Sequence, residues 1–505
     1  MSTENCIIVN QCLAAPKRAQ YGGGMIGFNQ RTNGSTLSSE LGVSNDGLHN
    51  TTLSILKTVK LEKGNLYTFS AVAFKASNGE LVHGGETMAK QGCWSLLKGG
   101  IVAEFTGVVE ILLMVVVSVY SSKAMEIRVD NVSLQPFTAK EWRSHQDKSI
   151  DKVIRINRVV FIAVVYLSLV NLIQVRKKKV SFKVTYANGT AADGALILIL
   201  QTKSGFPFGC GMNHYIVTDE AYRQWFASRF KVTSFTNEMK WYSTEKTRGV
   251  ENYTVADAMV NFAEQNGISI RGHNVFWDNR VMQPKWVKDL PPAELMKAAT
   301  RRLNSVVSRY AGRLIGWDVM NENLHFRFFE DKLGENASSM FYSMAYHLDP
   351  STTLFMNEYN TIENSKDHTA TACKYKEELE KILSFPGNAG LKAAIGLEGH
   401  FRDPKPNIAF MRSALDILGT MGLPIWLTEV DVGGGPDQCM TLANYDFEPT
   451  PVGEVVDKLI NEWKSGRRQV RTDSRGMSEI LLFHGDYRVK VSHPLINSSM
   501  SINFK

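Results

Sequence analysis

Two short stretches decide the fold of this chain: LIGWDVMNE at residues 314–322 and PIWLTEVDV at residues 424–432. Each is an apolar run of strand length that ends in polar and ionisable residues. Five further runs of this kind lie between about residues 205 and 465, separated by helical stretches: PFGCGMN (207–213), KVTSFTN (231–237), SIRGHNVFW (269–277), TLFMNEYN (353–360) and AIGLEGHF (394–401). This alternation predicts parallel β/α units of a (β/α)8 barrel, in which the chemistry lies at the strand ends.

The predicted barrel is one strand short. After Val432 the chain runs through GGGPDQCMTLANYDFEPTP (433–451) directly into a helical stretch at 452–463. This connection has no room for both a helix of about ten residues and an eighth apolar strand. We therefore expect a TIM-type barrel that lacks its eighth strand and the helix before it. Its first and seventh strands would be left unpaired on one side, which weakens the barrel.

Composition excludes several classes of protein. The chain has 505 residues, 57 Lys and Arg against 50 Asp and Glu, a formal charge of +7, and 44% hydrophobic residues. These values are ordinary for a globular protein, so we expect neither a disordered chain nor a nucleic-acid partner, and we expect a monomer. The six cysteines are too few and too scattered for a disulfide framework or a zinc site with paired cysteines.

Two segments bear on membranes and targeting. Residues 159–173 (VVFIAVVYLSLVNLI) are apolar and lie between basic residues, but they fall short of the roughly 20 residues that cross a bilayer. We expect a buried apolar insertion here, with a membrane span as the open alternative. Residues 1–16 show no basic stretch followed by an apolar core, so the start of the chain predicts no secretory signal.

Strand-rich segments lie on both sides of the predicted barrel. Between residues 20 and 137, short β-rich runs separated by Gly, Asn and Ser predict an all-β sandwich. Strand patterns also precede and follow the barrel, and we expect these two flanks to pair into one small sandwich. The predicted organisation is a β-sandwich module at 1–150, an apolar and basic junction at 151–179, a flank at 180–204, the barrel at 205–465 and a second flank at 466–505.

Two carboxyl groups stand at strand ends of this pattern. Glu322 follows one apolar run and Glu429 ends another, and a barrel would bring both to the same rim. Retaining glycoside hydrolysis needs two such groups, one that attacks the anomeric carbon and one that protonates the leaving oxygen. A single strand-end glutamate can equally be a helix N-cap or part of an ion pair. The hypothesis therefore rests on the presence of both glutamates.

The motifs around these carboxyls resemble glycoside hydrolase family 10, the endo-1,4-β-xylanases, and above all its plant members. The resemblance covers about residues 205–505 and rests on five motifs in the family's order: FTNEMKW (235–241), RGHNVFW (271–277), GWDVMNE (316–322), GLEGHF (396–401) and WLTEVDV (426–432). Upstream, four stretches resemble a family 22 carbohydrate-binding module: CLAAPKRAQYGGG (12–24), LYTFSAVAF (66–74), GCWSLLKGG (92–100) and VDNVSLQPF (129–137).

The resemblance implies a role for each residue around the two carboxyls. Glu322 would be the general acid and base, and Glu429 would be the nucleophile. Repulsion between two negative charges would favour a protonated Glu322 beside an ionised Glu429. Asn321 would donate a hydrogen bond to the sugar 2-hydroxyl. His400 resembles the histidine that hydrogen-bonds the nucleophile, and Asp431 would fix its tautomer.

Further residues are implied to bind substrate. The positions that hold the xylose unit just before the cleaved bond correspond to Asn237, Lys240, His273 and Trp277. Tyr359 would stack on the sugar just beyond that bond. For Trp277 and Tyr359 the alternative is core packing, since aromatic rings bury large apolar areas anywhere. Glu398, also assigned to substrate binding, stands where most microbial members have Gln, and Thr236 stands where they have Glu.

The implied activity is a retaining endo-1,4-β-xylanase that acts on cell-wall xylan or xylo-oligosaccharides without metal or cofactor. The family also implies an extracellular or cell-wall location. About thirty residues of the family pattern are missing between Gln438 and Met440, and residues 159–173 are foreign to it. Both departures could come from altered transcript processing, a gene-model error or a divergent paralogue. The alternative function is therefore a catalytically impaired xylan-binding relative whose incomplete barrel misplaces the carboxyls.

Overall fold

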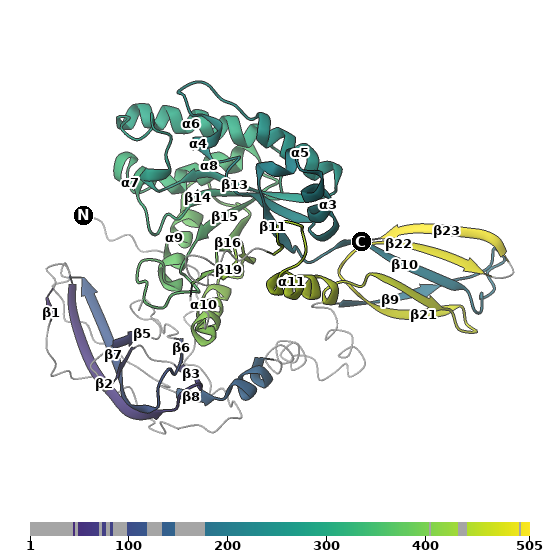
Figure 1. Ribbon diagram of the computed structural model, residues 1–505, viewed down its shortest axis with the longest axis horizontal. Helices are drawn as coiled ribbons and strands as arrows, with labels where there is room; N and C mark the ends of the chain where they lie inside the picture. Colours follow the sequence, from purple (N-terminus) through teal and green to yellow (C-terminus); the bar gives the residue numbers. More distant parts are fainter. Residues whose placement is uncertain are drawn as a thin grey trace. The chain divides into compact units, whose positions relative to one another are not determined.

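A computed structural model of the chain describes residues 44–45, 49–69, 73–76, 81–83, 98–118, 134–146, 177–402, 406–432, 442–493 and 496–504. The apolar stretch at 159–173 and the shortened connection at 433–441 lie outside these residues. The chain divides into two compact units. One comprises Met1–Trp142, Lys240–Glu251 and Asn274–Gln438, and the other comprises Arg143–Met239, Asn252–His273 and Cys439–Lys505. Helices and strands of the described residues are labelled in Figure 1.

A parallel sheet of seven strands is the centre of the fold, and its strands lie side by side in sequence order. They are β11 (Gly209–Met212), β12 (Val232–Phe235), β13 (Ser269–Trp277), β14 (Gly316–Asn321), β15 (Thr353–Glu358), β16 (Ala393–Leu397) and β18 (Ile425–Leu427). The seven predicted runs are thus confirmed as strands. Among the described residues no ladder joins the edge strands β11 and β18, so the sheet forms an open half-barrel rather than a closed barrel.

Helices connect the parallel strands, as the predicted alternation requires. They are α3 (Glu220–Arg229), α4 (Trp241–Thr244), α5 (Thr254–Gln265), α6 (Pro292–Arg309), α7 (Phe328–Leu333), α8 (Ala337–Leu348), α9 (Ala372–Ser384) and α10 (Ile408–Gly419). A further helix, α11 (Pro451–Glu462), follows the last parallel strand. In α6, proline stands at the first position, where its missing N–H is not needed. Leu295, Ala299, Leu303 and Val306 recur at helical spacing and are buried on one face.

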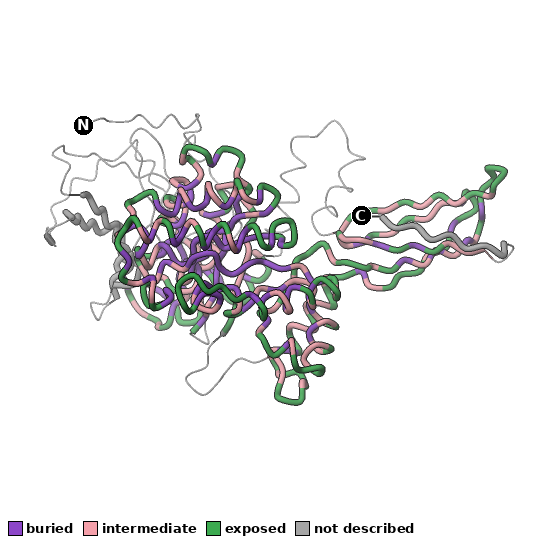
Figure 2. The backbone as a smooth tube through the Cα atoms, turned by 90° about the horizontal axis from the view of Figure 1, so that it is seen from above, coloured by how far each residue is buried: buried purple, intermediate pink, exposed green. Residues whose placement is uncertain are grey.

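The burial of the central strands follows from this arrangement. All residues of β14 and of β16 are buried, because a parallel sheet is covered on both of its faces. In Figure 2 the coiled segments of the tube alternate between buried and exposed positions. The edge strand β18 is less protected, since Leu427 keeps 46% of its surface exposed. An eighth strand would lie beside this edge in a complete barrel.

The two flanks of the barrel pair with each other, which confirms the predicted small sandwich. Their strands are β9 (Lys177–Lys183), β10 (Leu196–Ser204), β20 (Arg467–Arg471), β21 (Met477–Phe483), β22 (Gly485–His493) and β23 (Ile496–Phe504). One antiparallel sheet has the order β20-β10-β22-β23, and β21 pairs with β9 in the other. Ile197, Ile199, Leu482, Tyr487 and Val489 form the buried core between them.

The N-terminal region also contains antiparallel strands. They are β1 (Ser44–Asn45), β2 (His49–Leu61), β3 (Leu66–Phe69), β4 (Ala73–Ala76), β5 (Leu81–His83), β6 (Gly99–Val102), β7 (Gly107–Ser118) and β8 (Leu134–Phe137). They form one sheet of order β1-β2-β7-β4-β5 and one of order β6-β3-β8. Much of residues 1–150 lies outside the described ranges, so the predicted sandwich module there stays a prediction. No helix in the described parts of the chain is long and apolar enough to cross a membrane.

Candidate active site

Glu322 follows β14 at a distortion of that strand. The register of β14 against β15 shifts between Asp318 and Met320, which marks a bulge that re-aims the side chains after it. The backbone of Glu322 has a φ of 58°, a value that few residues other than glycine adopt. Its N–H donates to the carbonyl oxygen of Asn357 at 2.9 Å, which holds the turn. Such backbone strain is commonly found at functional sites.

The Glu322 carboxyl lies in an environment that favours its protonated form. Only 9% of the residue is exposed, and the indole Nε1 of Trp277 donates to its Oε2 at 2.7 Å. Burial raises the pKa of Glu322 to about 7, with the charges of Glu358 and Glu429 acting in the same direction. The Trp277 hydrogen bond and Lys240 oppose this rise. A carboxyl with this pKa can donate a proton near neutral pH.

Glu429 lies two residues beyond the end of β18 and is half-buried. Its N–H donates to the carbonyl oxygen of Glu398 at 3.0 Å, and Asn357 Nδ2 donates to its Oε1 at 2.9 Å. Lys240 is a cation near these carboxyls: burial lowers its pKa, and the charges of Glu429 and Glu322 act against that effect. Glu429 thus has an amide donor and a cation that both favour its charged form.

Asn357, at the carboxyl end of β15, joins the strand ends into one network. It is fully buried, and its Nδ2 lies 2.9 Å from Asn321 Oδ1, 3.0 Å from Glu398 Oε1 and 2.9 Å from Glu429 Oε1. Thr428 Oγ1 donates to its Oδ1 at 2.6 Å. Because the Asn321 carbonyl accepts from Asn357, the amide N–H groups of Asn321 remain as donors, the property that a contact with a sugar hydroxyl requires.

A second network links three residues next to Glu429. His400 Nε2 lies 2.9 Å from Glu398 Oε2, and His400 Nδ1 lies 3.0 Å from Asp431 Oδ1. The hydrogen bond to Glu398 is the main cause that raises the pKa of His400 to about 9. A raised pKa favours the protonated ring of His400, and the predicted role of Asp431 in fixing a tautomer stays a prediction. The partners that the structure assigns to His400 are thus Glu398 and Asp431.

Comparison with known proteins settles the family. The model of Glycosyl hydrolase family 10 matches residues 198–464. The chain belongs to this family. It is 43% identical to "Endo-1,4-beta-xylanase 5-like" of Arabidopsis thaliana over 98% of this chain and 90% of that protein, and 43% identical to "Endo-1,4-beta-xylanase 5" of the same plant over the same shares. The crystal structure of native xylanase 10B from Thermotoga maritima is 22% identical, with a TM-score of 0.43, over 50% of this chain and 95% of that one.

As a family 10 member the protein is a glycosidase, and the predicted catalytic pair lies in a single network. Glu322 and Glu429 are both connected to Asn357, the first through its backbone and the second through its side chain. Lys240 Nζ lies 4.4 Å from the centre of the Trp277 ring, and the same ring donates to Glu322. Trp277 therefore contacts Glu322 and Lys240 together, a position that the sequence did not indicate.

The other predicted substrate-binding residues fall into different settings. His273 is buried on β13, four residues before Trp277, and Asn237 is exposed in the segment after β12. Glu398 is 2% exposed, and its two oxygens face Asn357 and His400. Its carboxyl group therefore contacts neighbouring protein groups, and its predicted contact with the sugar stays a prediction. Burial raises the pKa of Glu398 well above its usual range, which the Glu429 charge reinforces.

Tyr359 belongs to a third cluster, which sequence analysis missed. One face of its ring stacks on His325 with centroids 3.8 Å apart and an angle of 11°. His325 Nδ1 lies 2.7 Å from Glu358 Oε1 and its Nε2 lies 2.8 Å from Asp367 Oδ2. Burial lowers the pKa of His325, but the bonds to the two carboxylates outweigh it and raise the pKa to about 9. Tyr359 is half-buried, and its predicted stacking on a sugar ring stays a prediction.

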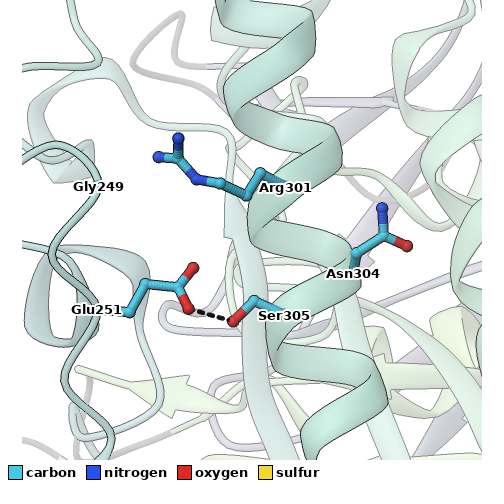
Figure 3. A pocket seen from close by; sticks show the side chains of 5 residues that line it. All are labelled: Gly249, Glu251, Arg301, Asn304 and Ser305. Atoms are coloured by element: carbon cyan, nitrogen blue, oxygen red, sulfur yellow. Dashed lines mark hydrogen bonds between the residues drawn. The ribbon is translucent and has the colours of Figure 1, made fainter.

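Two other features of the first unit could hold a ligand. The ligand atoms of Glu398, His400 and Glu429 lie within 4.8 Å of one another, close enough to hold an ion. Both nitrogens of His400 already face carboxylates, so we interpret the group as a hydrogen-bonded network. Figure 3 shows a surface pocket lined by Gly249, Glu251, Arg301, Asn304 and Ser305. Ser305 donates to Glu251 at 2.5 Å there, and neither catalytic candidate lines it.

Replacing Asn357 by alanine tests the central network. We expect the variant to lose about 1–3 kcal/mol of stability, because buried acceptors lose their donor, and to lose about 100-fold in kcat, because Glu429 is no longer held. Thermal unfolding and glycosidase rates measure the two effects. Thr428→Ser keeps the hydroxyl that binds Asn357 and is the matched control, expected near the wild type. An unchanged kcat in Asn357→Ala would show that Asn357 does not position Glu429.

Proposed function

We propose that this glycosidase is an endo-1,4-β-xylanase that hydrolyses internal β-1,4-xylosidic bonds of xylan with retention of configuration. The observation that carries the proposal is the unequal environment of two carboxyls in one network. Glu322 is buried and has a pKa of about 7, whereas Glu429 is half-buried and receives a hydrogen bond from the Asn357 amide. The Lys240 charge acts on both carboxyls. The named activity of the Arabidopsis relatives, which align along nearly the whole chain, supports the substrate.

The proposed reaction has two displacements. Glu429 attacks the anomeric carbon while protonated Glu322 gives its proton to the leaving oxygen, which releases one part of the xylan and leaves a xylosyl ester on Glu429. Glu322, now ionised, takes a proton from water as the water attacks the same carbon. This second step breaks the ester and restores both carboxyls. Asn321, fixed by Asn357, is placed to donate to the sugar 2-hydroxyl in both transition states.

The test is the release of reducing sugar from xylan by the purified chain, with proton NMR of the first product. We expect internal cleavage into oligosaccharides whose new reducing ends first appear as the β-anomer. An initial α-anomer would contradict the retaining mechanism. A folded chain that binds xylan without hydrolysing it would instead support the alternative, a catalytically impaired xylan-binding relative. The structural argument for that alternative is the open edge of β18.

The activity should fall as pH rises through about 7. Glu322 acts as an acid only when protonated, and its pKa in the folded protein is raised to about 7, so the protonated fraction is lost above that pH. The alkaline limb of kcat/KM against pH measures this pKa, because kcat/KM reports the ionisation of the enzyme without substrate. Trp277→Phe removes a hydrogen bond that lowers the pKa, so its limb should move to higher pH. A limb that stays in place in this variant would contradict the assigned hydrogen bond.

We also propose that residues 1–150 form a carbohydrate-binding module of the family 22 type. The support is the four quoted stretches and the antiparallel strands that are described in this region. Retention on insoluble xylan should be stronger for the full chain than for a chain that begins at residue 151. Equal retention of the two would contradict the module.

A further inference from the structure

The positive charge of this chain is concentrated in the small sandwich made by the two flanks. The described residues of that sandwich, 177–204, 466–493 and 496–504, contain 11 Lys and Arg against 4 Asp and Glu, a formal charge of +7. The whole chain also has a charge of +7, so the rest of it sums to zero. This charge is therefore a local property of the sandwich, in contrast with the balanced composition elsewhere.

The register of the four-stranded sheet places several of these cations on one face. Ile197, Ile199 and Val470 point into the core, so the alternate residues of β10 and β20 point outward. Leu200 lies between Arg467 and Arg488, its cross-strand neighbours on either side. In the same way Leu198 lies between Gln469 and Lys490, and Leu196 between Arg471 and Ser492. We call the surface of Leu196, Leu198, Leu200, Arg467, Arg471, Arg488 and Lys490 the basic face.

The cations of the basic face lack carboxylate partners. Arg467, Arg471, Arg488 and Lys490 are exposed, and no ion pair involves them among the residues that the structure describes. Arg471 donates to the carbonyl oxygen of Gly194 at 3.0 Å. On the opposite sheet the situation differs, since Lys179 pairs with Glu479 at 2.5 Å. The alternation of buried and exposed positions along these strands can be followed in Figure 2.

The spacing of the basic face suits a linear polyanion. Two rows of cations flank the leucine row of β10, so they lie roughly 10 Å apart, twice the distance between neighbouring strands. A chain laid along the leucines would have cations on both sides, and Arg binds planar carboxylates through paired N–H donors. The outward positions of β10, β20 and β22 at the basic face carry no aromatic ring, whereas single-stranded nucleic acids are bound largely by aromatic stacking. A carboxylate-bearing polymer therefore fits better than a nucleic acid.

We propose that the basic face binds a linear polysaccharide whose sugars carry carboxylates and so holds the enzyme near its substrate in a mixed polysaccharide matrix. The biological purpose rests on the proposed xylanase function, but binding itself does not. The site is separate from the catalytic carboxyls in sequence and needs no hydrolysis. Its strength should fall with salt, because exposed charges are screened within about 10 Å at 0.1 M ionic strength.

Affinity electrophoresis of the full chain in gels that contain polygalacturonate tests the proposal. We expect retardation of the wild type that disappears when the polymer is fully methyl-esterified, since esterification removes the charge and keeps the backbone. The variant Arg467→Gln/Arg488→Gln/Lys490→Gln should bind at least about tenfold more weakly, from three lost contacts of exposed charges. If the triple variant does not fold, the single variants Arg488→Gln and Lys490→Gln should each bind about twofold more weakly.

The matched control removes the same charge from other parts of the sandwich. Lys178→Gln/Lys183→Gln/Arg475→Gln changes exposed residues of β9 and the residue before the Gly476 turn. We expect it to bind polygalacturonate within about twofold of the wild type. Equal weakening of both triple variants would overturn the proposal in favour of non-specific charge attraction. Tighter binding of oligo-dT than of polygalacturonate, lost in the basic-face variant, would overturn it in favour of a nucleic-acid surface. Xylan hydrolysis is measured separately, so its failure would leave this result intact.

Discussion

Glu429→Gly is expected to lower the rate of xylan hydrolysis at least about 10⁴-fold, because the variant has no group to form the glycosyl ester. The loss should appear in kcat for every substrate, including those with activated leaving groups, since the nucleophile is needed whatever the leaving group. Reducing-sugar release measures the rate on xylan. Dinitrophenol release from an aryl β-xylobioside measures the rate with an activated leaving group. Circular dichroism checks that the variant keeps its fold.

Azide distinguishes a missing nucleophile from a damaged site. In Glu429→Gly the lost side chain leaves room for azide, which would attack the anomeric carbon, displace dinitrophenolate and give the α-xylobiosyl azide. Glu429→Gln fills that space without a nucleophile, so it is the matched control and should show no rescue. A β-azide product from Glu429→Gly, or appreciable hydrolysis without azide, would show that Glu429 does not attack the sugar.

The sequence predicted the strands of the central sheet well, because β13, β14, β15 and β16 are buried along almost their whole length. Runs such as AAIGL in β16 are continuously apolar for this reason, and both their existence and their order were confirmed. The pairing of the two flanks was also confirmed, since the alternation in β10 and β22 leaves one face to be buried. The length of β18 was not foreseen: only Ile425–Leu427 form the strand, because its outer side has no partner among the described residues.

The site was predictable where function depends on a strand end and unpredictable where it depends on contacts between strands. Glu322 and Glu429 follow from the strand-end rule. Asn357 satisfies the same rule in TLFMNEYN, and the polar residue after that buried run was the signal that could have identified it. The pairing of His400 with Glu398, and of His325 with Glu358 and Asp367, depends on side chains that meet across the fold. No spacing in the sequence predicts such pairs.

Glu322→Ala is expected to lower kcat on xylan by about 10²–10⁴-fold, because the leaving oxygen departs without a proton. The loss should depend on the leaving group, unlike that of Glu429→Gly. With an aryl xylobioside that releases dinitrophenolate, the first step needs no acid, and the slow second step should give a burst of dinitrophenol followed by a low steady rate. Stopped-flow absorbance measures both phases.

The same variant should change the pH profile and the product formed with azide. Removal of the group whose pKa is about 7 should abolish the alkaline limb near that pH. Azide would now attack the xylosyl ester on Glu429 from the opposite face and give the β-xylobiosyl azide, the reverse of the product from Glu429→Gly. Glu322→Asp, which keeps a carboxyl on a shorter side chain, should retain an alkaline limb with a lower kcat. An unchanged alkaline limb in Glu322→Ala would show that another buried carboxyl is the acid. Glu398 would be the first candidate, because Asn357 contacts both Glu398 and Glu429.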